Sequence, residues 1–272
     1  MPRRALDELI AAGHDLRSRG EATTAESLLR QAVLVAESTD ADPDTARGLP
    51  AALNELGMTC KDLAKYDEAR ALYERAVSVL EQSPDASEHD IATLYHNLGG
   101  IEHARGNFRD AEPLARRGLA LRTGLDESDD ARAADLVALA AILDGQRRFD
   151  AAEELYVEAL TILERAPDQN RGEIAVALNN LGANYLERGR TTAALVLLRR
   201  SEAIKRDVLG ARHPDLAMSL NNLAVANKRR GDLAAAKRLY REALGIFEAS
   251  LGTDHPKAIT CRRNLSNLEK TS

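Results

Sequence analysis

Tryptophan is absent from this sequence of 272 residues, and all aromatic residues together make up only 3% of it. The hydrophobic share of 44% therefore rests mainly on Ala, Leu, Val and Ile, which suit closely packed helices. A charged share of 29% is typical of a folded chain rather than a disordered one. The composition thus predicts a globular protein with few rings in its core.

Features that would mark other classes of protein are also missing. No apolar run approaches the roughly 20 residues that cross a membrane. The N-terminal stretch carries Asp7, Glu8 and Asp15 where a signal peptide needs an uncharged apolar run. Two cysteines, Cys60 and Cys261, are too few for a disulfide framework and have no metal-ligand spacing. These absences favour a cytoplasmic protein, and the net charge of −6 argues against a nucleic-acid partner.

Catalytic motifs are missing as well. The sequence contains no phosphate-binding loop, no G-x-S-x-G and no H-E-x-x-H. We therefore predict that the chain is not an enzyme and uses no cofactor or metal. The acidic loop Asp126–Asp130 lacks the Gly and terminal Glu of a calcium loop, which favours a solvated connector.

What the sequence does contain is an internal repeat. One small residue recurs at intervals of 44, 42, 41, 42 and 42 residues, at Gly13, Gly57, Gly99, Ala140, Gly182 and Ala224. Twelve residues further on, every copy has Ala, at Ala25, Ala69, Ala111, Ala152, Ala194 and Ala236. A third small column follows at Ala32, Ala76, Gly118, Ala159, Ser201 and Ala243. Small residues at fixed positions let helix backbones approach closely.

Each repeat contains two helical patterns around a turn, which often holds Gly, a residue suited to positive φ. We expect an all-α, right-handed solenoid of six helical hairpins that forms a single domain over residues 1–272. The expected repeats cover residues 4–40, 48–84, 90–124, 131–166, 173–209 and 215–251. A capping helix with a polar outer face follows at about residues 256–270.

The repeat resembles the tetratricopeptide repeat, in which a bulky-x-x-Leu-Gly segment is followed by Tyr, Ala, an aromatic residue and Ala. Leu178-Asn179-Asn180-Leu181-Gly182 and the matching segments carry this resemblance. The unit exceeds the usual length of about 34 residues. This length and the Leu-Gly-x-x-His-Pro segments at Leu209–Pro214 and Leu251–Pro256 make the unit similar to the kinesin-light-chain type of the repeat. That type is also common in bacterial proteins. Ala- and Arg-rich composition likewise suggests a bacterial source.

The resemblance implies that the first helix of each hairpin lines a concave groove that binds a peptide or helix of another protein. Helical periodicity then assigns the groove-facing residues: Asn54, Met58, His96, Asn97, His103, Asn179, Asn180, Asn221, Asn222, Lys228, Arg229, Arg263, Asn264 and Asn267. In relatives, matching Asn residues hold peptide backbone, which the resemblance implies for Asn97, Asn180 and Asn222. The alternative is that these Asn side chains bond neighbouring repeats and specify the stack.

Repeat four interrupts the row of Asn with Val137, Ala138 and Ala141. These residues form an apolar pocket, mark a bend, or reflect drift in a tolerant repeat. Near the C-terminus, Lys228, Arg229, Arg230 and Arg263 form either a docking site for an acidic peptide or carboxylate, or a solvated basic face.

His213 and His255 each precede Pro at an expected helix start, which favours a role at the helix N-terminus over metal binding. The favoured function is an adaptor or scaffold that binds a partner protein. The alternative is a regulatory subunit that senses a peptide or ligand and acts on a separate effector chain, and an enzyme subunit ranks third. The partner's identity and the oligomeric state stay open.

Overall fold

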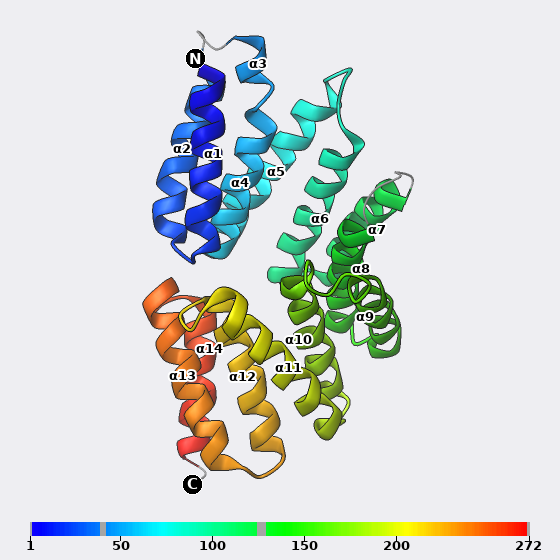
Figure 1. Ribbon diagram of the computed structural model, residues 1–272, viewed down its shortest axis with the longest axis vertical. Coiled ribbons are helices and arrows are strands. Elements are labelled where there is room, and N and C mark those ends of the chain that lie inside the picture. Colours follow the sequence, from blue (N-terminus) through cyan, green and yellow to red (C-terminus); the bar gives the residue numbers. More distant parts are fainter. Residues whose placement is uncertain (1, 39–41, 124–128, 271–272) are drawn as a thin grey trace. The chain divides into compact units, whose positions relative to one another are not determined.

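The computed structural model describes residues 2–38, 42–123 and 129–270. Helices make up the described structure, and no strand occurs in it (Figure 1). They are α1 (Pro2–Ser18), α2 (Ala22–Glu37), α3 (Pro43–Ala46), α4 (Leu49–Asp62), α5 (Tyr66–Glu81), α6 (Glu88–Ala104), α7 (Phe108–Thr123), α8 (Asp129–Gly145), α9 (Phe149–Leu163), α10 (Arg171–Glu187), α11 (Thr191–Leu209), α12 (Pro214–Arg229), α13 (Leu233–Leu251) and α14 (Pro256–Glu269). None of the helices described has both the length and the apolar character to span a bilayer.

The chain divides into two compact units, Met1–Glu127 and Ser128–Ser272. In the first unit, α1 pairs with α2, α4 with α5, and α6 with α7. Each hairpin then packs on the next, through α2 against α4 and through α5 against α6. The short helix α3 occupies the connection that makes the first repeat interval two residues longer than most.

The second unit repeats this arrangement. Helix α8 pairs with α9, α10 with α11, and α12 with α13, and α14 packs against α13 at the end of the stack. The first helices of neighbouring hairpins also touch, α8 with α10 and α10 with α12. The predicted all-α solenoid class is confirmed, whereas a single continuous domain over residues 1–272 stays a prediction.

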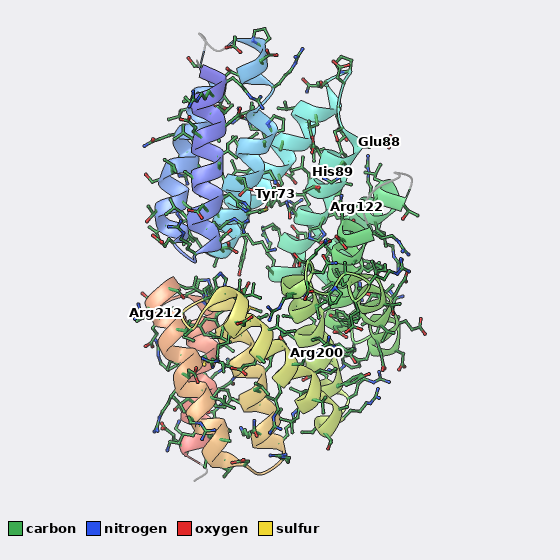
Figure 2. All side chains as sticks on the ribbon, in the orientation of Figure 1. Tyr73, Glu88, His89, Arg122, Arg200 and Arg212 are labelled. Atoms are coloured by element: carbon green, nitrogen blue, oxygen red, sulfur yellow. The ribbon has the colours of Figure 1, made fainter. Side chains whose placement is uncertain are left out.

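The small-residue columns mark the closest approaches between helices. All six Ala residues of the second column are 0% exposed. A Cβ added to Gly57 would lie 2.5 Å from the ring of Tyr73, which is fully buried and labelled in Figure 2. A Cβ on Gly182 would lie 2.7 Å from Leu198. The small residue therefore makes room for a bulky side chain of the second helix in the same hairpin.

The turns inside the hairpins share one backbone conformation. Gly106 has φ +81° and Gly189 has φ +74°, which confirms the expected use of Gly at these turns. Ala64 and Arg147 occupy the same place in repeats two and four, with φ of 60° and 63°. Repeat four therefore keeps the turn of the other repeats although it lacks the Gly, and its non-Gly residue adopts a conformation that costs about 1 kcal/mol.

The predicted role of the two histidines is confirmed. The Nδ1 atom of His213 accepts a hydrogen bond from the backbone N–H of Asp215 at 3.1 Å, and Pro214 follows as the first residue of α12. His255 caps α14 in the same way, with Nδ1 3.2 Å from the N–H of Lys257. Each ring satisfies a backbone donor that the start of a helix leaves without a partner.

Candidate binding surface on the first helices

In the second unit, Asn side chains join the first helices of successive hairpins. Asn222 on α12 donates from Nδ2 to Oδ1 of Asn179 on α10 at 3.1 Å. Asn264 on α14 donates in the same manner to Asn221 on α12 at 3.4 Å. Asn179 also donates to Oδ1 of Asn180 at 3.2 Å and is only 3% exposed. The row of Asn thus forms lateral bridges between neighbouring first helices.

A bridge of the same kind occurs in the first unit. Asn97 on α6 donates to Oδ1 of Asn54 on α4 at 2.7 Å, and Asn97 is 7% exposed. Asn54 in turn lies 4.0 Å from the sulfur of Met58. His96 is half-buried on α6, and the ring of His103 meets that of Phe108 edge-on, with centroids 5.5 Å apart.

These bridges occupy only part of the hydrogen-bonding capacity of each carboxamide, which offers two donors and two acceptor lone pairs. The hydrogen bonds favour the alternative in which Asn connects the repeats. Contact between the same residues and a peptide backbone stays a prediction.

In repeat four, Val137 is 8% exposed, and Ala138 and Ala141 are half-buried. An apolar pocket at these three residues also stays a prediction.

A pocket does occur in the second unit, between α12, α13 and α14. Its volume is about 260 Å³, and it is lined by Met218, Asn221, Asn222, Phe247, Pro256, Lys257 and Thr260. Only Asn221 and Asn222 of this lining were among the predicted site residues. Met218 and Phe247 follow the apolar pattern of core residues, and Pro256, Lys257 and Thr260 precede the three residues of α14 that were predicted for the groove. Thr260 precedes Asn264 by one helical turn, and this spacing could have found it.

Positive charge without a partner lies on two of the helices that form this pocket. The described cations whose side chains form no hydrogen bond, ion pair or ring contact are Arg109, Arg199, Arg212, Lys228, Arg238, Lys257, Arg263 and Lys270. Lys228 belongs to α12, and Lys257 and Arg263 belong to α14. Arg229, also predicted for this surface, is bound instead to Glu187 at 3.3 Å and to the carbonyl of Leu186.

We name the α12/α14 surface by its residues: Asn221, Asn222, Lys228, Lys257, Arg263, Asn264 and Asn267. Lys228, Arg263 and Asn267 are exposed, and the other four are partly exposed. The surface combines amide groups with cations that have no counter-charge in the described structure. It therefore suits a ligand that supplies carbonyl groups and negative charge.

The second helices of the hairpins present a different surface. Their charges form ion pairs between successive hairpins, such as Arg200 (labelled in Figure 2) with Glu164 at 2.7 Å. Further pairs of this kind are Arg30–Glu68, Arg75–Glu37 and Arg206–Glu242. Exposed pairs contribute little stability each, about 0–1 kcal/mol. They do mean that much of the charge on this surface already has a partner inside the chain.

A family model places the chain among known proteins. The model of the tetratricopeptide repeat matches residues 48–124, 90–165, 129–207, 173–249 and 215–272. The chain belongs to the tetratricopeptide repeat family. The matches begin at residue 48, so the first predicted repeat rests on its sequence columns and on the α1/α2 hairpin.

Solved structures with the same fold include kinesin-light-chain-like tetratricopeptide repeat proteins. BtubC (BKLC) from P. vanneervenii is 24% identical, with a TM-score of 0.59 over 92% of this chain and 94% of that chain. A variant of a Podosopora anserina putative kinesin light chain with nearly identical TPR-like repeats is 22% identical, with a TM-score of 0.50 over 73% and 94%. The resemblance to kinesin-light-chain-type repeats is thereby confirmed.

A third similar structure is a Rap protein complexed with Competence and Sporulation Factor. It is 16% identical, with a TM-score of 0.64 over 98% of this chain and 89% of that chain. At these identities the likenesses establish the tetratricopeptide repeat fold. No curated protein sequence matches the chain.

A half-buried carboxyl group that the sequence did not reveal connects repeats four and five. Asp144, near the end of α8, accepts hydrogen bonds from Nδ2 of Asn184 at 2.6 Å and from the hydroxyl of Tyr156 at 3.1 Å. Asn184 is 1% exposed and also donates to the carbonyl of Phe149 at 3.0 Å. Burial raises the pKa of Asp144 to about 6, against the two hydrogen bonds, which act to lower it. The sequence showed Asp144 only as a departure from the repeat.

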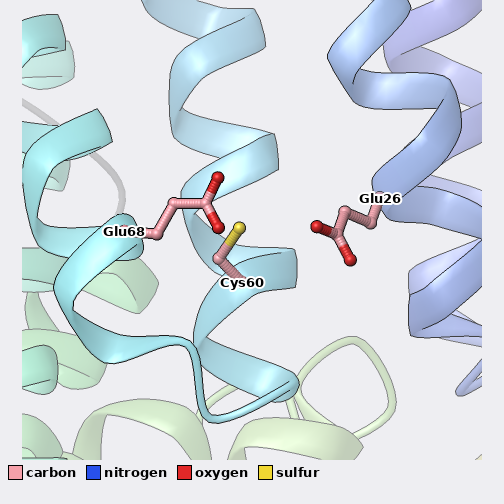
Figure 3. A group of neighbouring side chains, drawn as sticks. All are labelled: Glu26, Cys60 and Glu68. Atoms are coloured by element: carbon pink, nitrogen blue, oxygen red, sulfur yellow. The ribbon is translucent and has the colours of Figure 1, made fainter.

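Two carboxylates and a thiol lie together in the first unit, where Figure 3 shows Glu26, Cys60 and Glu68. Their ligand atoms are within 4.8 Å of one another. Both oxygens of Glu26 accept from Lys65 at 2.7 Å, and Arg30 binds Glu26 at 2.7 Å and Glu68 at 2.5 Å. Burial raises the pKa of the Cys60 thiol to about 12, so the group is protonated at neutral pH. The cluster is an ion-pair network and does not fit a metal site. The acidic loop Asp126–Asp130 falls largely outside the described residues.

Proposed function

We propose that the chain is an interaction scaffold and that its α12/α14 surface binds an extended or helical segment of a partner protein. Membership of the tetratricopeptide repeat family supports the general role in protein–protein interaction. The observation that carries the specific proposal is the position of Lys228, Lys257 and Arg263. These cations have no partner in the described structure. Lys257 lines the pocket, and Lys228 and Arg263 share helices α12 and α14 with the row of amide groups. The proposal includes no catalytic step.

The chemistry of the surface indicates how such a segment is held. Asn221 and Asn222 keep donors and acceptors beyond those used in their bridges, and a peptide backbone supplies the complementary C=O and N–H groups. The cations favour a segment that carries Asp or Glu, because charge complementarity speeds association and excludes basic partners. Affinity then depends on a few anchoring side chains rather than on the contact area.

The test is selection of random linear peptides on the full chain, followed by affinity measurements on the peptides that are enriched. The double variant Lys228→Ala/Arg263→Ala should weaken their binding about tenfold, because each substitution removes one charged contact that contributes about 0.7 kcal/mol to the binding free energy. Arg199→Ala/Arg238→Ala is the matched control, since it removes two cations without partners from the second helices. Enriched peptides that lose affinity only with the control pair would show that the binding surface lies elsewhere.

The second candidate is a regulatory subunit that binds a peptide or other factor and acts on a separate effector chain. The Rap structure supports it, because a chain of similar fold was solved in complex with Competence and Sporulation Factor. The two candidates differ in whether binding changes the shape of the chain. Small-angle scattering with and without a saturating enriched peptide separates them: an altered profile supports the regulatory subunit, and an unchanged one supports the scaffold.

A further inference from the structure

The pocket between α12, α13 and α14 has a floor and a mouth of different chemistry. Phe247, which is 2% exposed, and the partly buried Met218 form an apolar floor. A volume of about 260 Å³ is that of roughly nine liquid waters, enough for one large side chain. Water released from such a floor by an apolar group favours binding.

The mouth of the pocket is positive. Lys257 lies in the first turn of α14, where the helix dipole adds positive potential, and has no partner among the described residues. Lys205, 4% exposed, lies nearby and donates to the backbone carbonyl of Asp215 at 3.2 Å. Burial lowers the pKa of Lys205, the carboxylate of Asp215 acts to raise it, and the ammonium of Lys257 acts to lower it. Among the described residues, none of those that line the pocket carries a carboxylate.

We infer that this pocket anchors a partner peptide through one large apolar side chain, such as Leu or Phe, with the carboxylate of an adjacent Asp or Glu paired to Lys257. The apolar floor selects the side chain, and the ammonium at the mouth selects the neighbouring charge. Asn221 and Asn222, on the pocket wall, are placed to bond the peptide backbone between the two. The inference rests on the proposed function and specifies the ligand of one part of the α12/α14 surface.

Three capped dipeptides serve as probes: acetyl-Leu-Asp-amide, acetyl-Leu-Asn-amide and acetyl-Leu-Lys-amide. They differ only in the charge presented beside the leucine. The chain contains 3 methionines, so methyl labelling of Met gives a sparse NMR spectrum. Met218 reports on the pocket, and Met58 in the first unit is an internal control. The experiment uses the full chain.

We expect the Asp probe to shift the Met218 methyl resonance saturably and to bind about threefold more tightly than the Asn probe, the gain from one partly exposed ion pair. The substitution Lys257→Glu should reverse the order, so that the Lys probe binds best. Thr260→Trp, at an exposed position of the lining, should abolish the Met218 shifts for all three probes without unfolding the chain. The Met58 resonance should not respond.

Equal affinities for the three probes, an unchanged order with Lys257→Glu, or shifts at Met58 in place of Met218 would overturn the inference. Its failure is distinguishable from failure of the proposed function. If peptides enriched on the full chain depend on Lys228 and Arg263 but not on Lys257 or Thr260, the surface binds a peptide and the pocket is not its anchor. If the dipeptides bind as expected but the selection enriches none of the random linear peptides, the scaffold proposal fails and the proposed chemistry of the pocket stands.

Discussion

Substituting Asn for Asp144 tests whether burial controls the charge of this carboxyl group. Asn keeps the shape of the side chain and an acceptor for Asn184, and its amide can donate to the hydroxyl of Tyr156. The substitution therefore removes the ionisable proton with little change in packing. Tyr156→Phe is a second variant, which removes one hydrogen bond that favours the charged form and should raise the pKa of Asp144 further.

The sign of the effect follows from the direction of the shift. The pKa of Asp144 is about 6 in the folded chain, against 3.8 for the unfolded reference, so the folded state holds the proton more tightly. Stability from this group is gained as the pH falls through 6 towards 4 and lost as the pH rises through 6. Between about pH 7.5 and pH 5 the linkage relation gives a gain of about 1.4 kcal/mol.

The assay is guanidinium unfolding at these two pH values, followed by far-ultraviolet circular dichroism. Hydrogen exchange of α8–α10 amides provides a local readout, because solenoids can unfold in parts. The wild type should gain about 1.4 kcal/mol relative to Asp144→Asn on going to the lower pH. Asp254→Asn, which removes a carboxylate from an exposed position, controls for the loss of one charge.

Two results would refute this reasoning about Asp144. One is a difference between wild type and Asp144→Asn that is the same at both pH values. The other is a wild type that loses stability relative to the variant as the pH falls, which would mean that the two hydrogen bonds outweigh burial and hold the folded-state pKa below the unfolded one.

Three further predictions concern backbone fit, and thermal or denaturant unfolding checks each of them. Gly57→Ala should destabilise the chain by about 1–3 kcal/mol because its Cβ would lie 2.5 Å from a tyrosine ring, whereas Gly245→Ala, with open space in the middle of α13, should stabilise it by about 1 kcal/mol. Arg147→Gly should stabilise the chain by about 1 kcal/mol, because Gly adopts a positive φ without strain, and Gly189→Ala should destabilise it by a similar amount. Destabilisation by Arg147→Gly together with stabilisation by Gly189→Ala would contradict the account of the turns. His255→Ala should cost about 1 kcal/mol through loss of the N-cap, and His255→Asn should retain most of it.

Much of the fold could be predicted from spacing alone. Small residues at fixed intervals imply a repeated close contact, and the buried Ala columns and the contact between Gly57 and Tyr73 are that contact. The histidines before Pro214 and Pro256 were assigned correctly because the start of a helix has a local chemical requirement. Helix α3 was not predicted, since the longer first interval gives only the presence of extra residues and not their conformation.

The candidate site was harder to predict because it depends on contacts between repeats. Periodicity places Asn221 and Asn222 on α12, yet the partners that they bridge to lie 43 positions away. The pocket needs side chains from three helices, and Phe247 enters it from a helix whose pattern predicts only core packing. Asp144 appears in the sequence as a break in the repeat, and its environment comes from α9 and α10.

Hydrogen exchange of the full chain with and without a saturating enriched peptide tests the central claim, that the α12/α14 surface binds a partner segment, most directly. The account predicts slower exchange in α12 and in the first turns of α14, with α5 and α11 unchanged. Protection confined to second helices such as α11, with α12 and α14 unaffected, would contradict it.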